Sequence, residues 1–365
     1  GAGMTADLVV ECPAAKRAGL TQVMQILPKE AGLPEGIPDG VASFQRWRID
    51  GAAGWKALES SLERVSPNLG KLARITVESA GQVFDPNFNL QRDLVGNLGD
   101  DFITFSLPPT GTNLLQLSRS GRVQMVGSPN PARLTSGWKA LEALVHMQAG
   151  ALEFSERTGP GGRKVMVATV AAKGGAQNAF QMVQAPNHVV IASDGPSMDA
   201  YFAAASGRRA PTPPGNTTVP AVPAAPAPQA PVAPAPGANA TAAVAQTSTP
   251  VQTPTPGAPG GVAAIPGWSE AVAGVGGTGR GLFGFAQPAL ELRPVWEALR
   301  TSESLAGVMP AGTTSLETVQ AVESWADFKR LPPFEAVARY WTLQALSGAT
   351  DAEGYRFQWF SPRAP

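Results

Sequence analysis

Hydrophobic and polar positions along the chain follow two different periods, which predicts strands interleaved with helices. In 42–50, Phe44 alternates with polar neighbours, as expected of a half-buried strand, and a hydrophobic strand is expected at 101–107. Over 54–65 and 132–148 apolar residues recur three and four positions apart, which is typical of amphipathic helices whose apolar stripe includes Val65 at the end of the first. We therefore expect an α+β protein built from strand–helix units, with the helices packed on one face of the sheet.

Turn residues indicate that the strands pair mainly as hairpins. Gly159-Pro160-Gly161-Gly162 separates the predicted strands 151–158 and 163–171, and Pro186-Asn187 separates 178–184 from 187–192. Frequent hairpins favour an antiparallel sheet. Further strands are expected at 6–12, 122–127, 282–285, 341–347 and 355–360, and further helices at 14–27, 69–83, 89–96, 196–205, 289–300 and 315–328.

One hexapeptide, Gly-Trp-Lys-Ala-Leu-Glu, occurs twice, at 54–59 and at 137–142. A degenerate third copy runs from Trp296 to Leu299. Each copy follows a strand-like run and lies in a helix-like stretch. This predicts a duplicated strand–helix unit in which Trp55, Trp138 and Trp296 anchor their helices to a shared sheet.

A segment rich in Pro, Ala and Thr interrupts this pattern. Residues 210–269 contain no charged side chain, and few large apolar groups are present to offset the entropy of ordering the chain. We expect a disordered linker or insert at 209–266. It would separate an α+β repeat region at 1–208 from a part at 267–365 that completes the same module.

Composition narrows the range of partners. Lys and Arg together number 28, as do Asp and Glu, and the charged fraction is only 15%. This neutral balance provides no electrostatic case for nucleic acid. No run approaches the ~18 apolar residues of a transmembrane helix. The only cysteine, Cys12, cannot form an intrachain disulfide and is expected to be a small buried hydrophobe.

Three carboxylates provide the only candidate metal ligands. Asp93, Asp100 and Asp101 flank the glycine-containing stretch 95–99, and carboxylates at this density could hold a hard cation such as calcium. No calcium-loop spacing accompanies them. In the alternative interpretation, Asp100 and Asp101 accept hydrogen bonds from backbone donors of the turn made by Gly99.

Three other patterns resemble catalytic or cofactor motifs but lack the context that those motifs require. Gly274–Gly279 matches a dinucleotide fingerprint yet precedes a strand, so we expect a flexible entry to that strand. Ser136 and Lys139 match an acyl-serine pattern, but Ser136 is expected to begin a helix. His146 and His188 are expected to be structural or exposed. We therefore predict no catalytic residue and no cofactor.

The run from Phe88 to Asp101, Phe-Asn-Leu-Gln-Arg-Asp-Leu-Val-Gly-Asn-Leu-Gly-Asp-Asp, is followed at once by a hydrophobic strand. It resembles a hallmark of an uncharacterised bacterial domain-of-unknown-function family. Gly276–Gly279, Glu297–Arg300 and Leu331–Phe334 are also similar to members of planctomycete or verrucomicrobium type. The resemblance implies an exported or envelope-associated protein and assigns no catalytic residue.

These observations lead to two functional hypotheses. The first is a non-enzymatic, periplasmic or envelope-associated protein that presents a sheet or groove to another protein or to cell-wall polymer. The second is a hydrolase or transferase whose site is built from scattered carboxylates, with two acidic side chains facing each other across a cleft.

Overall fold

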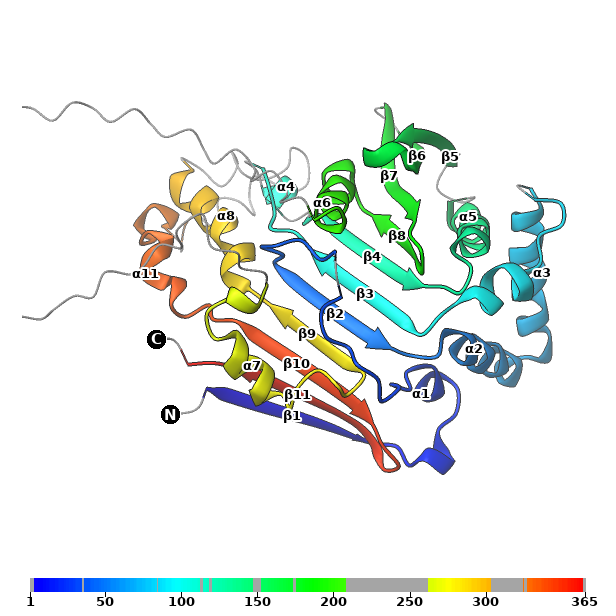
Figure 1. The fold of residues 1–365 in the computed structure, drawn as a ribbon, viewed down its shortest axis with the longest axis horizontal. Coiled ribbons are helices and arrows are strands. Elements are labelled where there is room, and N and C mark those ends of the chain that lie inside the picture. Colours follow the sequence, from blue (N-terminus) through cyan, green and yellow to red (C-terminus); the bar gives the residue numbers. More distant parts are fainter. Residues whose placement is uncertain are drawn as a thin grey trace, which may run out of the picture. The chain divides into compact units, whose positions relative to one another are not determined.

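The fold is an α+β arrangement around one antiparallel sheet, as the sequence predicts. The computed structural model describes residues 3–34, 36–83, 85–111, 114–117, 120–146, 152–172, 175–207, 262–302, 324 and 327–363. Residues 1–210 and 261–365 form one compact unit. Within it, eleven strands pair in the order β1-β11-β10-β9-β2-β3-β4-β8-β7-β6-β5, and neighbouring strands run antiparallel throughout (Figure 1).

The strands come from both sides of the Pro/Ala-rich segment. β9, β10 and β11 lie beyond that segment in sequence and are inserted between β1 and β2. The strands are β1 (Met4–Glu11), β2 (Ser43–Arg48), β3 (Asp101–Ser106), β4 (Arg122–Gly127), β5 (Leu152–Thr158), β6 (Lys164–Ala172), β7 (Gly175–Gln184), β8 (His188–Ala192), β9 (Leu282–Ala286), β10 (Gln344–Thr350) and β11 (Gly354–Ser361).

Helices connect the strands and cover the sheet. They are α1 (Leu20–Val23), α2 (Gly51–Val65), α3 (Pro67–Gln82), α4 (Leu114–Leu117), α5 (Pro131–His146), α6 (Gly195–Ala205), α7 (Trp268–Gly274), α8 (Pro288–Thr301) and α11 (Phe334–Ala338). Shorter helical turns are η1 (Ala14–Lys16), η2 (Leu90–Leu94), η3 (Val95–Asn97), η4 (Pro160–Gly162), η5 (Val262–Ala264) and η6 (Phe328–Arg330).

Each face of the sheet carries its own core. On the first face, Phe44, Phe105 and Val123 lie opposite one another on adjacent strands and are fully buried beneath α6, α7 and the segment 31–41. On the second face, Val126 and Val189 pack against α3, α5 and η2. The central strands are therefore covered on both sides, and the expectation that the helices pack on one face is wrong.

The three tryptophan helices do not occupy equivalent places. β2 and β4 are both antiparallel to β3, so α2 and α5 follow strands that run in the same direction and lie toward one end of the sheet (Figure 1). β9 runs antiparallel to β2, and α8 therefore lies toward the opposite end.

The prediction that each tryptophan anchors its helix to the sheet is confirmed for two of the three copies of the hexapeptide. Trp55 and Trp138 pack against the core of the second face. Trp296 instead contacts the turn before α11: its Nε1–H donates to the carbonyl of Pro332 at 2.8 Å, and its ring lies edge-on to Phe334 at 6.3 Å. The third copy thus anchors its helix to residues 332–334 rather than to the sheet.

The N-terminal segment departs from the predicted pattern. The helix expected at 14–27 is broken into η1 and α1, with Gly19 between them at a φ of 62° that favours glycine. Cys12 is half-buried rather than in the core. Val65, expected on the inward stripe, is 78% exposed because it is the last residue of α2.

Two predictions fall mainly outside the described residues. Most of the helix expected at 315–328 lies there, as does the predicted linker up to residue 261. The end of that linker is described and is ordered: Val262–Ala264 form η5, and Val262 and Ile265 pack against the first core. The apolar side chains of Val262 and Ile265 explain the order of this end of the predicted linker, because they are partly buried against the core.

Candidate functional site

Asp101 is the centre of a charged network on the first face of the sheet. It is the first residue of β3 and lies directly opposite Arg48 of β2. On the other side of β3, Gly127 of β4 comes next in the register, and His188 of β8 lies opposite Gly127. Gly127 has no side chain, and a Cβ there would come within 3.0 Å of the Asp101 Cβ. The glycine therefore leaves room for Asp101 to reach His188 across an intervening strand.

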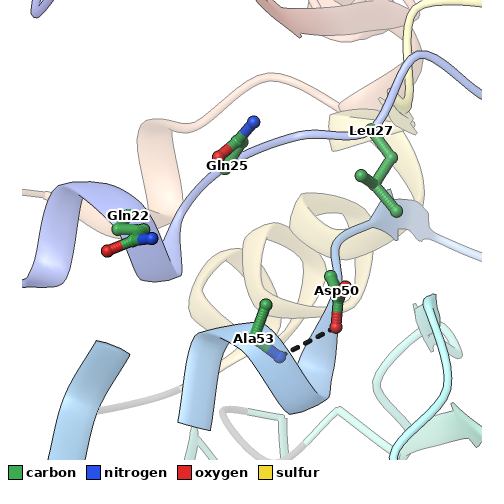
Figure 2. Close-up of a pocket in the computed structure, with 5 residues that line it drawn as sticks. All are labelled: Gln22, Gln25, Leu27, Asp50 and Ala53. Atoms are coloured by element: carbon green, nitrogen blue, oxygen red, sulfur yellow. Dashed lines mark hydrogen bonds between the residues drawn. The ribbon is translucent and has the colours of Figure 1, made fainter. Parts of the chain in front are cut away.

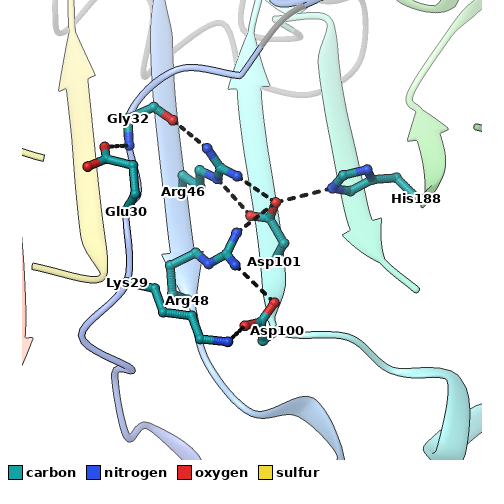
Figure 3. A network of polar contacts seen from close by, with 8 residues as sticks. All are labelled: Lys29, Glu30, Gly32, Arg46, Arg48, Asp100, Asp101 and His188. Atoms are coloured by element: carbon teal, nitrogen blue, oxygen red, sulfur yellow. Dashed lines mark hydrogen bonds and ion pairs between the residues drawn. The ribbon is translucent and has the colours of Figure 1, made fainter. Parts of the chain in front are cut away.

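The Asp101 carboxylate accepts from three side chains (Figure 3). Arg46 binds it with two nitrogens, Nε at 2.8 Å and Nη2 at 2.7 Å, and Arg48 Nη1 lies at 2.9 Å. His188 Nε2 is 3.3 Å away. Burial alone would raise the pKa of Asp101, but the hydrogen bonds from His188 and Arg46 and the charges of Arg46 and Arg48 outweigh it and hold the pKa well below its usual value of 3.8.

Asp100 extends the network to the segment that covers the first face. It pairs with Lys29 and, at 3.1 Å, with Arg48 Nη2. Burial opposes ionisation of Asp100, yet these two cations lower its pKa. Arg46 Nη1 also donates to the carbonyl of Gly32 at 2.7 Å. The network thus fastens residues 29–32 onto β2 and β3.

Asp93 has separate partners. It lies in η2, where Arg92 donates to it through Nε at 2.8 Å and Nη2 at 2.6 Å, and the backbone N–H of Asn89 donates at 2.8 Å. The Arg92 hydrogen bonds are the main reason why the pKa of Asp93 is lowered. In the described part of the chain, no three Asp, Glu, His or Cys side chains gather in a way that could hold a metal ion.

The turn interpretation for Asp100 and Asp101 needs correction. Within the described residues, both carboxylates accept from Lys, Arg and His side chains, not from backbone amides around Gly99. The sequence contained a usable signal. Arg46 and Arg48 alternate on β2 and so share a face, and two inward cations in a half-buried strand require anionic partners.

The remaining sequence motifs have structural roles. Gly274–Gly279 connects the end of α7 to β9, the reverse of a strand–loop–helix phosphate site. Ser136 lies inside α5, where its hydroxyl donates to the Ala132 carbonyl at 3.4 Å. The helix start is instead Asn130, whose side chain accepts from the Arg133 N–H at 3.2 Å, so the expectation for Ser136 is wrong. The side chain of His146 lies outside the described residues.

A small pocket lies between α1 and the start of α2, with a volume of ≈ 130 Å³ (Figure 2). Its lining residues are Gln22, Gln25, Leu27, Asp50 and Ala53. Asp50 is the only ionisable group among them, and its Oδ1 accepts from the Ala53 N–H at 2.8 Å as the cap of α2. The pocket contains no pair of acidic groups, which the carboxylate-enzyme hypothesis would require.

The edge strand β1 differs from every feature above because it is open to solvent. All eight of its residues are exposed, including four large apolar side chains: Met4 at 72%, Leu8 at 48%, Val9 at 52% and Val10 at 43%. Among the described strands, β1 pairs with β11 alone. The cover provided by α7 ends at β11, where Phe360 is buried with Ala271. Within the described residues, the strand is therefore held by one ladder, and side chains on both of its faces are exposed.

The pairing pattern shows which backbone groups of β1 point outward. Cys12 N–H donates to the Glu353 carbonyl at 2.9 Å, which sets the phase of the ladder with β11. Hydrogen-bonded pairs alternate along antiparallel strands, so Val10, Leu8, Ala6 and Met4 bond to β11 as well. The N–H and C=O groups of Thr5, Asp7, Val9 and Glu11 are consequently directed to the free edge.

Comparison with protein-family models, curated proteins and solved structures finds no significant match. The resemblance to the bacterial family therefore stays a prediction. No helix in the described part of the chain combines the length and apolar character needed to cross a membrane.

Proposed function

We propose that this protein is a non-enzymatic, envelope-associated binding or scaffold protein that docks a partner along the free edge of β1. The observation that carries the proposal is the exposure of β1 over its whole length. Proteins usually protect long edge strands with charge, proline, bulges or a covering element, because an unpaired edge recruits further strands. β1 has charged side chains at Asp7 and Glu11, but its four exposed large apolar side chains and free backbone groups are typical of a site for β-strand addition, in which backbone hydrogen bonds provide affinity.

The charged network supports a structural role for Asp100 and Asp101. Asp100 and Asp101 are neutralised by Lys29, Arg46 and Arg48, and these bonds connect the covering segment to the central strands. Carboxylates held in this way stabilise the scaffold that presents β1. The envelope location is inferred from the family resemblance and from the Pro/Ala-rich segment, a kind of tether that is common in exported proteins.

Photo-crosslinking in the cells that make the protein tests the proposal. A photoreactive amino acid at Thr5, on the free edge, is expected to capture a discrete partner in the envelope fraction. Val9→Pro removes an outward N–H without removing a bond to β11, so it should abolish the adduct while the protein stays folded. The matched control places the probe at Glu153 on β5, the opposite edge of the sheet.

The two possible results differ clearly. An adduct that forms from Thr5, is absent from Glu153 and is lost with Val9→Pro supports docking along β1. Adducts that are the same from both edges, or that survive Val9→Pro, contradict it. Recovery of the protein in the cytoplasmic fraction would contradict the envelope assignment.

A further inference from the structure

The two faces of β1 differ in chemistry, and this difference defines the partner. Resting on the proposed docking along β1, we infer that the partner contributes an extended segment in which apolar residues alternate with lysine or arginine. The inference follows from the side chains that the partner would meet, because residues opposite each other in neighbouring strands lie on the same face.

One face of the β1 edge is apolar. Met4, Ala6, Leu8 and Val10 share it, and the register places Ala6 opposite Trp359 and Leu8 opposite Phe357 on β11. Trp359 is 37% exposed, and its ring lies 6.1 Å from that of Phe357. An added strand would extend this apolar surface, so its residues on this side are expected to be apolar.

The other face carries unpaired negative charge. Asp7 and Glu11 lie on it four residues apart, and neither forms an ion pair with a described residue. Arg356, opposite Val9, is already bound by Asp351 and Glu353, each at 2.9 Å, and Arg280 donates to the side chain of Gln358, opposite Asp7, at 3.1 Å. A docked strand would bring side chains directly beside both carboxylates. Lysine or arginine at two positions four apart would provide the missing counter-charge.

This charge requirement argues against a partner drawn from the same sequence. β1 contains no lysine or arginine, so two copies pairing through β1 would bring no cation to Asp7 or Glu11. A symmetric pairing centred on Val9 would even place Asp7 opposite Glu11. The Pro/Ala-rich residues 211–260 contain no charged side chain, and their prolines lack backbone donors. A separate, basic segment satisfies both faces of the edge.

Two synthetic peptides test the inference by fluorescence anisotropy. The first, Lys-Val-Thr-Ile-Lys-Val-Thr, places its lysines opposite Glu11 and Asp7 in an antiparallel pairing. The second replaces both lysines with glutamate. We expect the lysine peptide to bind about tenfold more tightly at low salt, since two cross-strand charge pairs contribute roughly that factor together. The preference should shrink as salt is added.

A charge-reversal variant identifies the residues responsible. Asp7→Lys with Glu11→Lys should reverse the preference between the two peptides. Asp39→Lys with Glu153→Lys changes the net charge equally at exposed sites away from β1 and should leave the preference unchanged. A preference that is absent, or that responds equally to both double variants, overturns the inference.

The outcomes also separate this inference from the proposed function. If both peptides bind equally and Val9→Pro abolishes both, docking along β1 stands and the basic character of the partner is wrong. If neither peptide binds and Val9→Pro leaves the cellular adduct unchanged, both fail. A concentration-dependent dimer in sedimentation experiments that Val9→Pro disrupts would overturn the inference in favour of a second copy.

Discussion

β3 and β1 are both antiparallel strands of one sheet, yet they differ in almost every interaction outside their ladders. β3 is bonded on both sides, its Phe105 is fully buried beneath the first-face helices, and its Asp101 is held by two arginines and a histidine. β1 is bonded on one side, its apolar residues face solvent, and Asp7 has no ion-pair partner among the described residues.

The comparison shows that apolar side chains in two strands of one sheet do not contribute equally to stability. Apolar side chains stabilise a fold only through the surface they remove from water. In β3 that surface is already buried within the chain. In β1 it remains available to a partner. The stability of the protein should therefore depend on β3, and its binding on β1.

The largest expected difference in the free energy of unfolding is between alanine substitutions of one apolar residue in each strand. Phe105→Ala should lower the free energy of unfolding by about 3–5 kcal/mol, because it leaves a cavity in a closed core. Leu8→Ala, at a position that is 48% exposed, should cost less than about 1 kcal/mol. Urea denaturation measures both. Similar losses for the two variants would show that β1 is covered in solution.

The acidic residues provide the next contrast. Asp101→Asn should cost about 3 kcal/mol, because it leaves the buried Arg46 without its anionic partner and removes one of the two carboxylates that bind Arg48. The same change at Asp7 should alter unfolding by no more than about 0.5 kcal/mol. The pair is compared in denaturation curves at neutral pH. An Asp7→Asn variant that is as unstable as Asp101→Asn would contradict the description of β1.

Gly127→Ala perturbs the space between Asp101 and His188. Its Cβ would lie 3.0 Å from the Cβ and carbonyl oxygen of Asp101, so we expect a loss of roughly 1–3 kcal/mol from crowding. Gly54→Ala is the control: it lies within α2, and its nearest neighbour would be Val23 at an ordinary 3.6 Å. That variant should be neutral or stabilised by roughly 0.5–1 kcal/mol. A neutral Gly127→Ala would mean that the network is looser than described.

The smallest of the expected effects is the loss of folding stability through Asp101 at acid pH. The pKa of Asp101 is lowered in the folded state, so its contribution to stability is present above the usual value of 3.8 and is lost as the pH falls below it. At about pH 2.8 the wild type should have lost roughly 1.4 kcal/mol through this group. Asp101→Asn should lack that part of the pH dependence. Parallel curves for the two proteins between about pH 5 and pH 3 would exclude Asp101 as the source.

Local sequence patterns were enough to predict the fold class and many elements. Gly159–Gly162 and Pro186-Asn187 indicate tight turns, and these turns do join antiparallel strands. The insertion of β9–β11 between β1 and β2 depends on contacts between residues more than two hundred positions apart. No local period records such a pairing, so the sheet order could not be predicted.

The site was predicted less well than the fold. Asp100 and Asp101 stood out by their density, but their partners Lys29, Arg46 and Arg48 become neighbours only when β2 and β3 pair. The exposure of β1 to solvent also could not be predicted from the sequence. Leu8, Val9 and Val10 indicate an ordinary buried strand, yet all three are exposed. Val9 lies on the face that α7 covers only as far as β11, and Leu8 and Val10 lie on the opposite face.

Residue-resolved amide hydrogen exchange by NMR tests most directly whether β1 is a docking edge. Without peptide, the amides of Thr5, Asp7, Val9 and Glu11 should exchange quickly, while those of Ala6, Leu8 and Val10 are protected by β11. Adding the lysine peptide should slow exchange at Thr5, Asp7, Val9 and Glu11. Peptide binding that leaves these four amides fast would contradict the account.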